Sequence, residues 1–272
     1  MITLGITTYN RKGLLIKTAQ SLLASNEIEK YNIRIYDDKS TALTKSEIKE
    51  IFPTAKDIIV RENNLRADAN IRKMYEDFLD TGDEIFVNAD SDLLFRPDWI
   101  SFLLNHFDHG DGVMSLYNSN HHPPESEFII KNSPFLLKPH LGSAGTVFHR
   151  RVVELIVKKL KNESSLRFDW KWSDLLRSNS IRLLCSKNSY IQHIGIDGQN
   201  SNGLDRFDFG LNFYPGSHTN EVYLVDFFQE LINGGLKNSL DAMEQVRNTK
   251  DFKLGSELLK YPRKIKRLFQ WN

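Results

Sequence analysis

The sequence contains one cysteine, Cys185, among its 272 residues. A single cysteine cannot form a disulfide within the chain or supply the thiolates of a cysteine-rich zinc site, and such scarcity is typical of reducing compartments. No stretch approaches the roughly 18 consecutive apolar residues of a membrane-spanning helix. The N-terminus also lacks the basic and apolar regions of a secretory signal. We therefore expect a cytoplasmic protein.

Charge of either sign is not in excess. The chain has 36 Lys and Arg residues against 35 Asp and Glu residues, which gives a formal net charge of +1. Nucleic-acid binding depends on clustered positive charge, so this balance argues against a nucleic-acid partner. Internal repeats and low-complexity tracts are lacking too, and the apolar fraction of 40% is that of a globular protein. The length permits two domains or one large α/β unit.

Four short apolar runs divide the first third of the chain. They are rich in β-formers and lie at residues 2–6, 33–35, 58–60 and 85–87. Helical spacing of apolar residues between the runs, as at 71–79, predicts connecting helices. Strands joined by single helices build a parallel sheet with helices on both faces, and ligands bind such sheets beyond the carboxyl ends of the strands. This arrangement predicts a Rossmann-like nucleotide-binding half.

After about residue 100 the pattern is less regular. Residues 118–139 are rich in Pro, His, Ser and Asn and predict a long irregular excursion. Later apolar spacing predicts three helices and one strand. The helices are expected at 149–160, 169–177 and 221–245, and the strand near 181–184, ahead of the segment 189–195.

Polar residues directly follow three of the predicted strands. They are Thr7-Thr-Tyr-Asn-Arg11, Asp37-Asp-Lys-Ser40 and Asn88-Ala-Asp-Ser-Asp92. The carboxylates of Asp90 and Asp92 are two residues apart and could together hold a hard divalent cation beside phosphate oxygens. Asp-x-Asp is by itself also typical of a surface turn. Its position after a buried strand favours the metal interpretation.

In this order, the motifs resemble those of the family 2 glycosyltransferases with the GT-A fold. The first two loops match the family's strand-end turns, Asp90-Ser91-Asp92 matches its metal motif, and Pro97-Asp-Trp99 matches the element that follows. The loop after the third strand departs from the family, because Asn64-Leu-Arg66 stands where Asn-x-Gly is usual. The resemblance is strongest over residues 1–105 and extends loosely to about 200.

The resemblance implies an α/β fold of GT-A type, a Rossmann-like mixed sheet flanked by helices with a helical C-terminal tail. Residues 1–220 would form a single catalytic domain, with a nucleotide-sugar half at 1–100 and an acceptor half at 101–220. Residues 221–272 would be a helical extension with a basic and aromatic end.

The implied donor site draws on all three loops. Asp38 would accept a hydrogen bond from a base such as uracil, and Asp90 and Asp92 would bind Mn²⁺ or Mg²⁺ with His193 as a third ligand. Alternatively, Asp37 and Asp38 form a turn that caps the next helix, and His193 is structural. The other donor-binding residues would be Thr7, Thr8, Tyr9, Asn10, Arg66 and Ser91.

The acceptor site is implied in the second half. Asp169 would be the catalytic base, with Asp174 in reserve, and Trp170 would offer its ring to the acceptor sugar. Phe168 stands where family members commonly have Glu. A glycine-containing loop, which could equally be an ordinary loop before a helix, would lie beneath the acceptor; it comprises Gly142, Ser143, Ala144 and Gly145.

The expected function is metal-dependent, inverting transfer of a sugar from a nucleoside diphosphate, UDP above all, to a hydroxyl of a glycan or lipid-linked acceptor. A sugar-1-phosphate nucleotidyltransferase is the alternative enzyme, although its glycine-rich triphosphate loop is not matched after the first strand. An inert nucleotide-sugar-binding module is the alternative of another class.

The C-terminal residues 254–272 combine five Lys and Arg residues and the single acid Glu257 with large apolar residues. This composition predicts one of two roles. The tail either packs on the domain or makes peripheral contact with the inner face of an anionic membrane.

Overall fold

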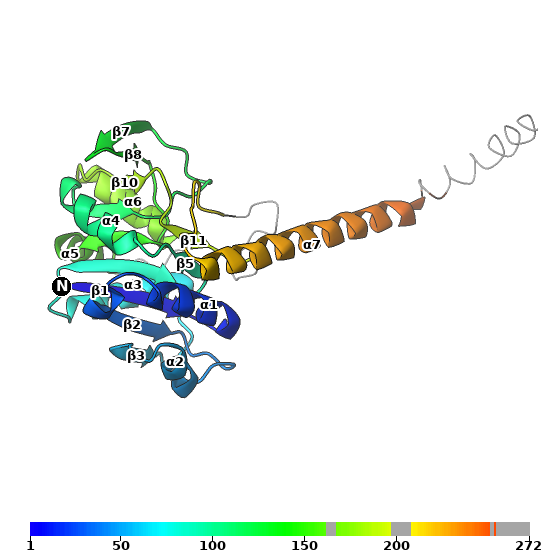
Figure 1. The fold of residues 1–272 in the computed structure, drawn as a ribbon, viewed down its shortest axis with the longest axis horizontal. Helices are drawn as coiled ribbons and strands as arrows, with labels where there is room; N and C mark the ends of the chain where they lie inside the picture. Colours follow the sequence, from blue (N-terminus) through cyan, green and yellow to red (C-terminus); the bar gives the residue numbers. More distant parts are fainter. Residues whose placement is uncertain (162–166, 197–207, 251–252, 254–272) are drawn as a thin grey trace, which may run out of the picture.

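The structure is a computed structural model that describes residues 1–161, 167–196, 208–250 and 253. Its centre is a mixed sheet of nine strands in the order β3-β2-β1-β4-β9-β6-β10-β8-β7, and β11 and β5 form a second, two-stranded sheet. Helices flank the large sheet (Figure 1). The expected α/β class, with a mixed sheet of GT-A type, is confirmed.

The bounds of the elements are as follows. The strands are β1 (Ile2–Thr8), β2 (Asn32–Asp37), β3 (Asp57–Val60), β4 (Ile85–Asp90), β5 (Leu93–Phe95), β6 (Val113–Ser115), β7 (Ser126–Ile130), β8 (Ser133–Leu137), β9 (Thr146–His149), β10 (Leu184–Ser186) and β11 (Ile191–His193). The helices are α1 (Lys12–Leu23), α2 (Lys45–Ile51), α3 (Ala67–Leu79), α4 (Trp99–His106), α5 (Arg150–Lys159), α6 (Phe168–Ser178) and α7 (His218–Asn248), with short 3₁₀ turns η1 (Ile28–Lys30) and η2 (Phe107–His109).

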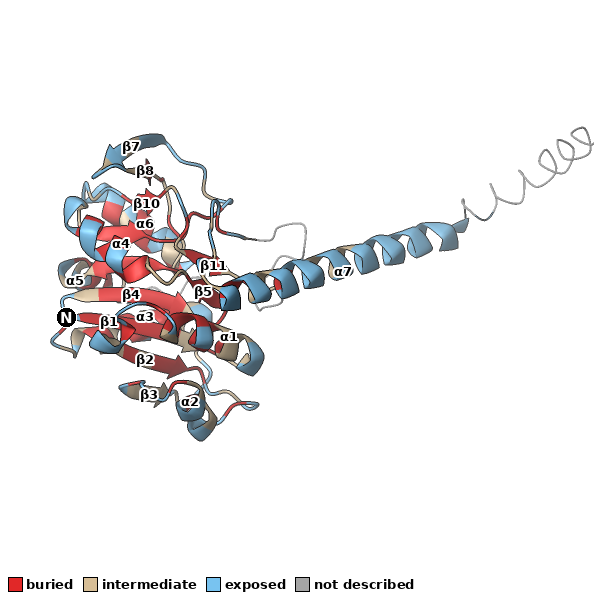
Figure 2. Cartoon of the chain, in the orientation of Figure 1, coloured by how far each residue is buried: buried red, intermediate tan, exposed pale blue. Residues whose placement is uncertain are grey.

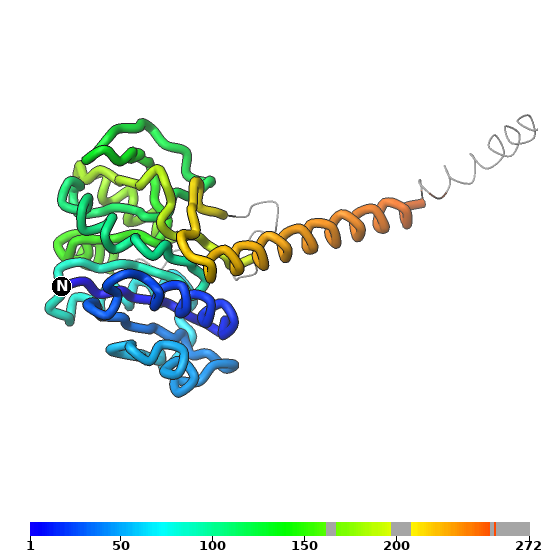
Figure 3. Tube along the Cα trace, in the orientation of Figure 1, coloured from blue at the N-terminus to red at the C-terminus, as the bar shows by residue number. Residues whose placement is uncertain are grey.

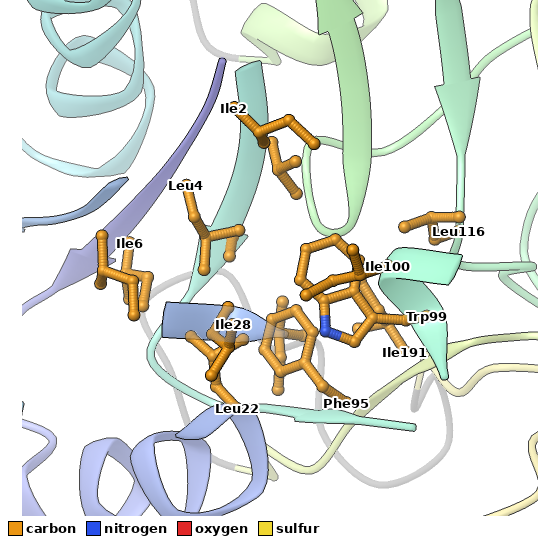
Figure 4. Close-up of a cluster of buried hydrophobic side chains, with 14 of the residues drawn as sticks. Ile2, Leu4, Ile6, Leu22, Ile28, Phe95, Trp99, Ile100, Leu116 and Ile191 are labelled. Carbon is orange, nitrogen blue, oxygen red and sulfur yellow. The ribbon is translucent and has the colours of Figure 1, made fainter. Parts of the chain in front are cut away.

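Two hydrophobic cores lie on the two faces of the sheet. Successive residues of a strand point to opposite faces, so β4 places Phe86 in one core and Val87 in the other. The first core packs β1, α1 and α4 together around Trp99 (Figure 4). The second packs α3 against α5 and α6, and Gly5 of β1 lets Met74 and Phe86 approach so closely that a Cβ there would collide with both. The cores therefore hold the strand ends in register.

The first four strands are parallel, as predicted from the apolar runs. β1 pairs with β2 and β4, and β2 pairs with β3. Beyond β4 the sheet is mixed, because β9 inserts between β4 and β6 and is antiparallel to both. Direction was not predictable because the apolar run of β9 has the same local pattern in either orientation.

The irregular excursion predicted at 118–139 is wrong in part. β7 and β8 form an antiparallel hairpin there, with Phe128 opposite Phe135. Lys131 and Asn132 make its two-residue turn with φ of 44° and 64°. Such turns need positive φ at both positions and usually carry Asn-Gly or Asp-Gly, so Lys-Asn is a weak hairpin signal. This weak signal explains why the hairpin was missed.

The predicted helices match α5, α6 and α7 closely, whereas the strand expected near 181–184 begins only at Leu184. α7 is 31 residues long and projects away from the sheet (Figures 1 and 3). Within the described residues, no helix is both long and apolar enough to span a bilayer. The basic and aromatic end at 254–272 lies outside the described residues.

Candidate active site

The Asp90-Ser91-Asp92 motif lies where β4 ends. Asp90 is the last residue of β4 and sits beside Thr7 of β1 in the parallel register. The Thr7 hydroxyl donates to Asp90 Oδ1 at 2.7 Å, so the first loop orients the first carboxylate of the motif. Ser91 and Asp92 follow, and both are buried.

Asp92 lies between two cationic groups. The Arg11 guanidinium donates to Asp92 Oδ2, and His193 Nε2 lies 3.2 Å from the same oxygen. β11 positions the imidazole because His193 pairs with Leu93, the residue that directly follows Asp92. The other oxygen, Asp92 Oδ1, is buried and has no hydrogen-bond partner. A carboxylate oxygen in that state is available to a cation.

The pKa values at this strand end shift in opposite directions. Burial and the negative charge of Asp92 raise the pKa of Asp90. Burial alone would raise the pKa of Asp92 as well, but His193 and Arg11 outweigh it and hold that pKa below its usual range. Burial lowers the pKa of His193, yet the attraction of Asp92 is stronger and raises it to about 9. The strand end therefore concentrates charge of both signs.

Asp90, Asp92 and His193 are brought to one place, but not as a preformed metal cage. Among the residues that the structure describes, no three His, Cys, Asp or Glu side chains are arranged to hold an ion. The donor set still suits Mn²⁺ or Mg²⁺, since it offers two carboxylates, one of them with an unpartnered oxygen, and an imidazole.

The second loop is joined by hydrogen bonds to the first loop and to the loop that follows β3. Asn10 Oδ1 accepts from the backbone N–H groups of Thr41 and Ala42. Each carboxylate oxygen of Asp38 accepts a hydrogen bond from a backbone N–H group, one from Leu65 at 2.7 Å and one from Arg66 at 2.8 Å. Asp38 thus organises the loop that departs from the family pattern, and contact with a base stays a prediction.

The alternative interpretation of Asp37 and Asp38 is correct about the turn and wrong about the cap. Asp37 Oδ2 accepts from Ser40 N at 2.9 Å, which closes a turn. Helix α2 is capped instead by Thr44 in a reciprocal pair with Glu47.

The remaining donor candidates of these loops differ in exposure. Tyr9 is half-buried and Arg66 is exposed, whereas Thr8 is buried with a hydroxyl that has no partner.

Asp169 lies in the first turn of α6, on the side of α3. The carboxylate of Asp68 in α3 accepts from the N–H groups of Arg167 and Phe168 and so caps α6. Burial raises the pKa of Asp169 to about 6, and the charges of Asp68 and Asp90 add to the rise. Because Asp90 affects Asp169 electrostatically, the fold brings the predicted base and the Asp90-Ser91-Asp92 motif into one region.

Trp170 is 41% exposed, unlike the buried Trp99 and Trp172. Its ring stacks on His140 with centroids 4.1 Å apart. His140 in turn lies 3.0 Å from Asp174, whose side chain is 66% exposed. Asp174 therefore belongs to an exposed pair next to Trp170, and the choice of Asp169 over Asp174 as the base stays a prediction.

The 142–145 loop is tied to β4 and β6. Asn88 Nδ2 donates to the Ser143 carbonyl, and Gly145 exchanges backbone hydrogen bonds with Asn88 and Leu116. Gly145 has a φ of +69°, and a Cβ there would crowd Tyr117 and Ile191. The close approach at Gly145 is thus to the protein itself, whereas Gly142 faces open space and Ser143 and Ala144 are half-buried.

Three residues of this region were not predicted. Arg11 directly follows the first motif and could have been noticed there. Gly195 approaches Asp92 so closely that a side chain would not fit. Asp208 accepts from the Tyr117 hydroxyl at 3.0 Å and the Ser119 hydroxyl at 2.6 Å, and its charge acts on His193. No local sequence signal identifies Asp208.

The sequence profile described as Glycosyl transferase family 2 matches residues 3–169. The chain belongs to this family. Membership favours sugar transfer over the nucleotidyl transfer and the inert module that the sequence left open. The match ends at Asp169, so it spans the strand-end motifs and the predicted base. A search of curated protein sequences finds no match.

Solved structures share the fold of this member of Glycosyl transferase family 2. TarS residues 1–349 of S. aureus in complex with UDP gives a TM-score of 0.53 at 15% identity, covering 70% of this chain and 59% of that chain. The same protein in complex with UDP-GlcNAc gives 0.52 at 15% identity, with coverage of 70% and 57%. GalNAc-T7 with UDP, GalNAc and Mn²⁺ gives 0.55 at 10% identity, with coverage of 68% and 42%. The chain thus spans about three fifths of the length of the TarS chains.

Proposed function

We propose that this glycosyltransferase moves a sugar from a UDP-sugar to a hydroxyl of a glycan or lipid-linked acceptor, with inversion at the anomeric carbon. Residues 1–220 form the catalytic domain in this proposal, with the donor bound by 1–100 and the acceptor by 101–220. The observation that carries it is the buried Asp92 carboxylate at the end of β4, with one oxygen unpartnered and Arg11 and His193 on the other.

The donor diphosphate binds at this strand end. Asp90, Asp92 and His193 would hold Mn²⁺ or Mg²⁺, which would supply positive charge to offset that of the diphosphate. Thr7 keeps the Asp90 carboxylate in place, and the guanidinium of Arg11 adds fixed positive charge at the same point. The structures of TarS with UDP and of GalNAc-T7 with UDP and Mn²⁺ support this donor and metal for a protein of the same fold.

Asp169 serves as the general base. Its raised pKa, about 6, leaves it ionised at neutral pH yet more basic than an ordinary carboxylate. It removes the proton of the acceptor hydroxyl while the hydroxyl oxygen bonds to the anomeric carbon and the bond from that carbon to the diphosphate breaks. The exposed face of Trp170, one residue away, packs against the acceptor sugar.

Thermal stabilisation tests the donor and the metal together. A ligand that binds the native state raises the melting temperature by mass action. We expect UDP with Mn²⁺ to stabilise the protein, and UDP alone or Mn²⁺ alone to stabilise it far less. Stabilisation by nucleoside triphosphates only, or by UDP to the same extent with and without Mn²⁺, would contradict the proposal.

A further inference from the structure

Helix α7 carries a stripe of exposed apolar side chains along its length. Eight of them are between 42% and 68% exposed, and successive members are three or four residues apart throughout. At about 100° per residue they share roughly one third of the helix circumference. We call this set the α7 stripe; it comprises Val222, Val225, Phe228, Ile232, Leu236, Leu240, Met243 and Val246.

The stripe lies on a helix that only its first turns anchor. Asn220 Nδ2 donates to the Phe95 carbonyl at 2.8 Å, and the buried Phe227 packs with Leu94 and Ile194. From Leu236 to Lys250 every residue is exposed, and the helix projects away from the domain (Figures 1 and 2). The exposed part from Leu236 to Asn248 is 13 of the 31 residues of α7, or about 20 Å of a helix about 46 Å long.

The projecting part is poorly suited to stand alone in water. Helices in proteins are stabilised chiefly by burial of an apolar face rather than by intrinsic propensity. Gly234 and Gly235 lie in the middle of α7, and glycine is among the weakest helix formers. A partner along the stripe would stabilise a continuous helix through this pair.

We propose that the α7 stripe pairs with the α7 stripe of a second copy of this chain, as a two-stranded coiled coil. The intervals between members of the stripe are 3, 3, 4, 4, 4, 3 and 3 residues, and their mean of about 3.4 is close to the 3.5-residue spacing at the seam of such a coil. The charged residues Asp226, Glu230, Lys237, Asp241 and Glu244 fall outside the stripe and keep the other faces in water.

Charge argues against an anionic lipid surface as the partner of the α7 stripe. α7 carries five acidic residues, Glu221, Asp226, Glu230, Asp241 and Glu244, against the two basic residues Lys237 and Arg247. Helices that lie on membranes carry Lys and Arg on their polar face, and an anionic bilayer repels an acidic helix. The stripe is thus unlike a membrane-binding face although it is apolar.

Pairing through α7 would join two catalytic domains close to their active sites. Ile194, which contacts the same cluster as Phe227, directly follows His193. The dimer contact itself uses none of the residues assigned to the donor or the acceptor, so disrupting it leaves those residues intact.

Sedimentation analysis of the full-length chain tests the pairing. We expect a mass of twice 31.5 kDa at high concentration, with dissociation on dilution. Ile232→Glu with Met243→Glu places two charges at the centre of the stripe and should weaken dimerisation by about 100-fold or more. Asn238→Glu with Gln245→Glu adds the same charge on the opposite face and should leave the dimer intact.

Two outcomes would overturn the inference. One is a single-chain mass for the unmodified protein at every concentration. The other is a monomeric unmodified protein that binds anionic vesicles, together with a variant, Ile232→Glu with Met243→Glu, that no longer binds them. That result would assign the stripe to a membrane. Because all four substituted residues are exposed, a melting temperature close to that of the unmodified chain is expected for both variants and shows that the domain is folded.

Discussion

Gly195 approaches the carboxylate of Asp92 so closely that a methyl group at residue 195 would overlap Asp92 Oδ2. Gly195 belongs to the segment that follows β11, and Asp92 follows β4, so two distant parts of the chain meet at the proposed metal site. The contact leaves no space for any side chain at this position.

We predict that Gly195→Ala displaces Asp92 and lowers kcat/KM by about 100-fold, the loss typical of a misplacement of about 1 Å in an active site. Gly82→Ala is the matched control, because a Cβ at Gly82 meets open space. Steady-state kinetics with a UDP-sugar measure both. Equal activity of the two variants would show that Asp92 need not hold its position.

Asp92→Asn should abolish metal-dependent transfer and the stabilisation by UDP with Mn²⁺. The substitution keeps the shape of the side chain but removes the charge that binds a cation and that faces Arg11 and His193. Asp98→Asn removes a carboxylate paired with Arg96 instead and should retain activity. A titration of activity with Mn²⁺ measures the effect, and near-full activity of Asp92→Asn at low Mn²⁺ refutes the metal assignment.

The rate should depend on pH through Asp169. Its pKa of about 6 means that the carboxylate is protonated below this pH and cannot accept a proton, so kcat should rise with pH and level off above about 6. Asp169→Asn should lose about 10² to 10⁴-fold in kcat and bind UDP normally. Asp174→Asn is the control and should keep its activity. If Asp174→Asn lost activity and Asp169→Asn kept it, Asp174 would be the base instead.

Asp169→Asn should also stabilise the protein at neutral pH. A carboxyl whose pKa is raised on folding favours the folded state only while it is protonated, so ionised Asp169 destabilises the fold above about pH 6. Removing the charge should raise the melting temperature by a few degrees at pH 8. The gain should vanish near pH 4, where folded-state Asp169 is protonated, and calorimetry at both pH values measures it.

Asp68→Asn should move the pH profile to lower pH. The charge of Asp68 contributes to the raised pKa of Asp169, while an Asn side chain still caps α6 through its carbonyl. We expect the midpoint of the kcat profile to fall by about half a unit to one unit. Glu76→Gln removes a charge from the same helix, where Glu76 pairs with Lys73, and should not move the midpoint.

The basic and aromatic end at 254–272 should bind anionic membranes, which would bring the enzyme to a lipid-linked acceptor at the inner face of a membrane. Each basic residue near an anionic surface contributes about 1 kcal/mol. Co-sedimentation with anionic and neutral vesicles, for the full chain and for one ending at Lys260, measures the contact. Equal, salt-insensitive partitioning of the two chains would remove the membrane from the proposal.

Local patterns in the sequence were sufficient for the first four strands, for the helices near 149–160, 169–177 and 221–245, and for the polar loops that meet at the strand ends. Periodicity and strand-end motifs are properties of neighbouring residues, so they can be recognised without a structure. The same kind of pattern led to the choice of Asp90, Asp92 and Asp169 as site candidates, and their roles stay predictions.

Only the tertiary structure decided how distant segments combine. The antiparallel direction of β9, the cap that Asp68 provides to α6, the approach of Gly195 to Asp92 and the hydrogen bonds of Asp208 each join residues about 60 or more positions apart. Such contacts depend on packing of the whole sheet, because no local pattern records which strand lies beside which. The sequence alone therefore determined the family and the chemical groups, and the packed fold determined which of those groups meet.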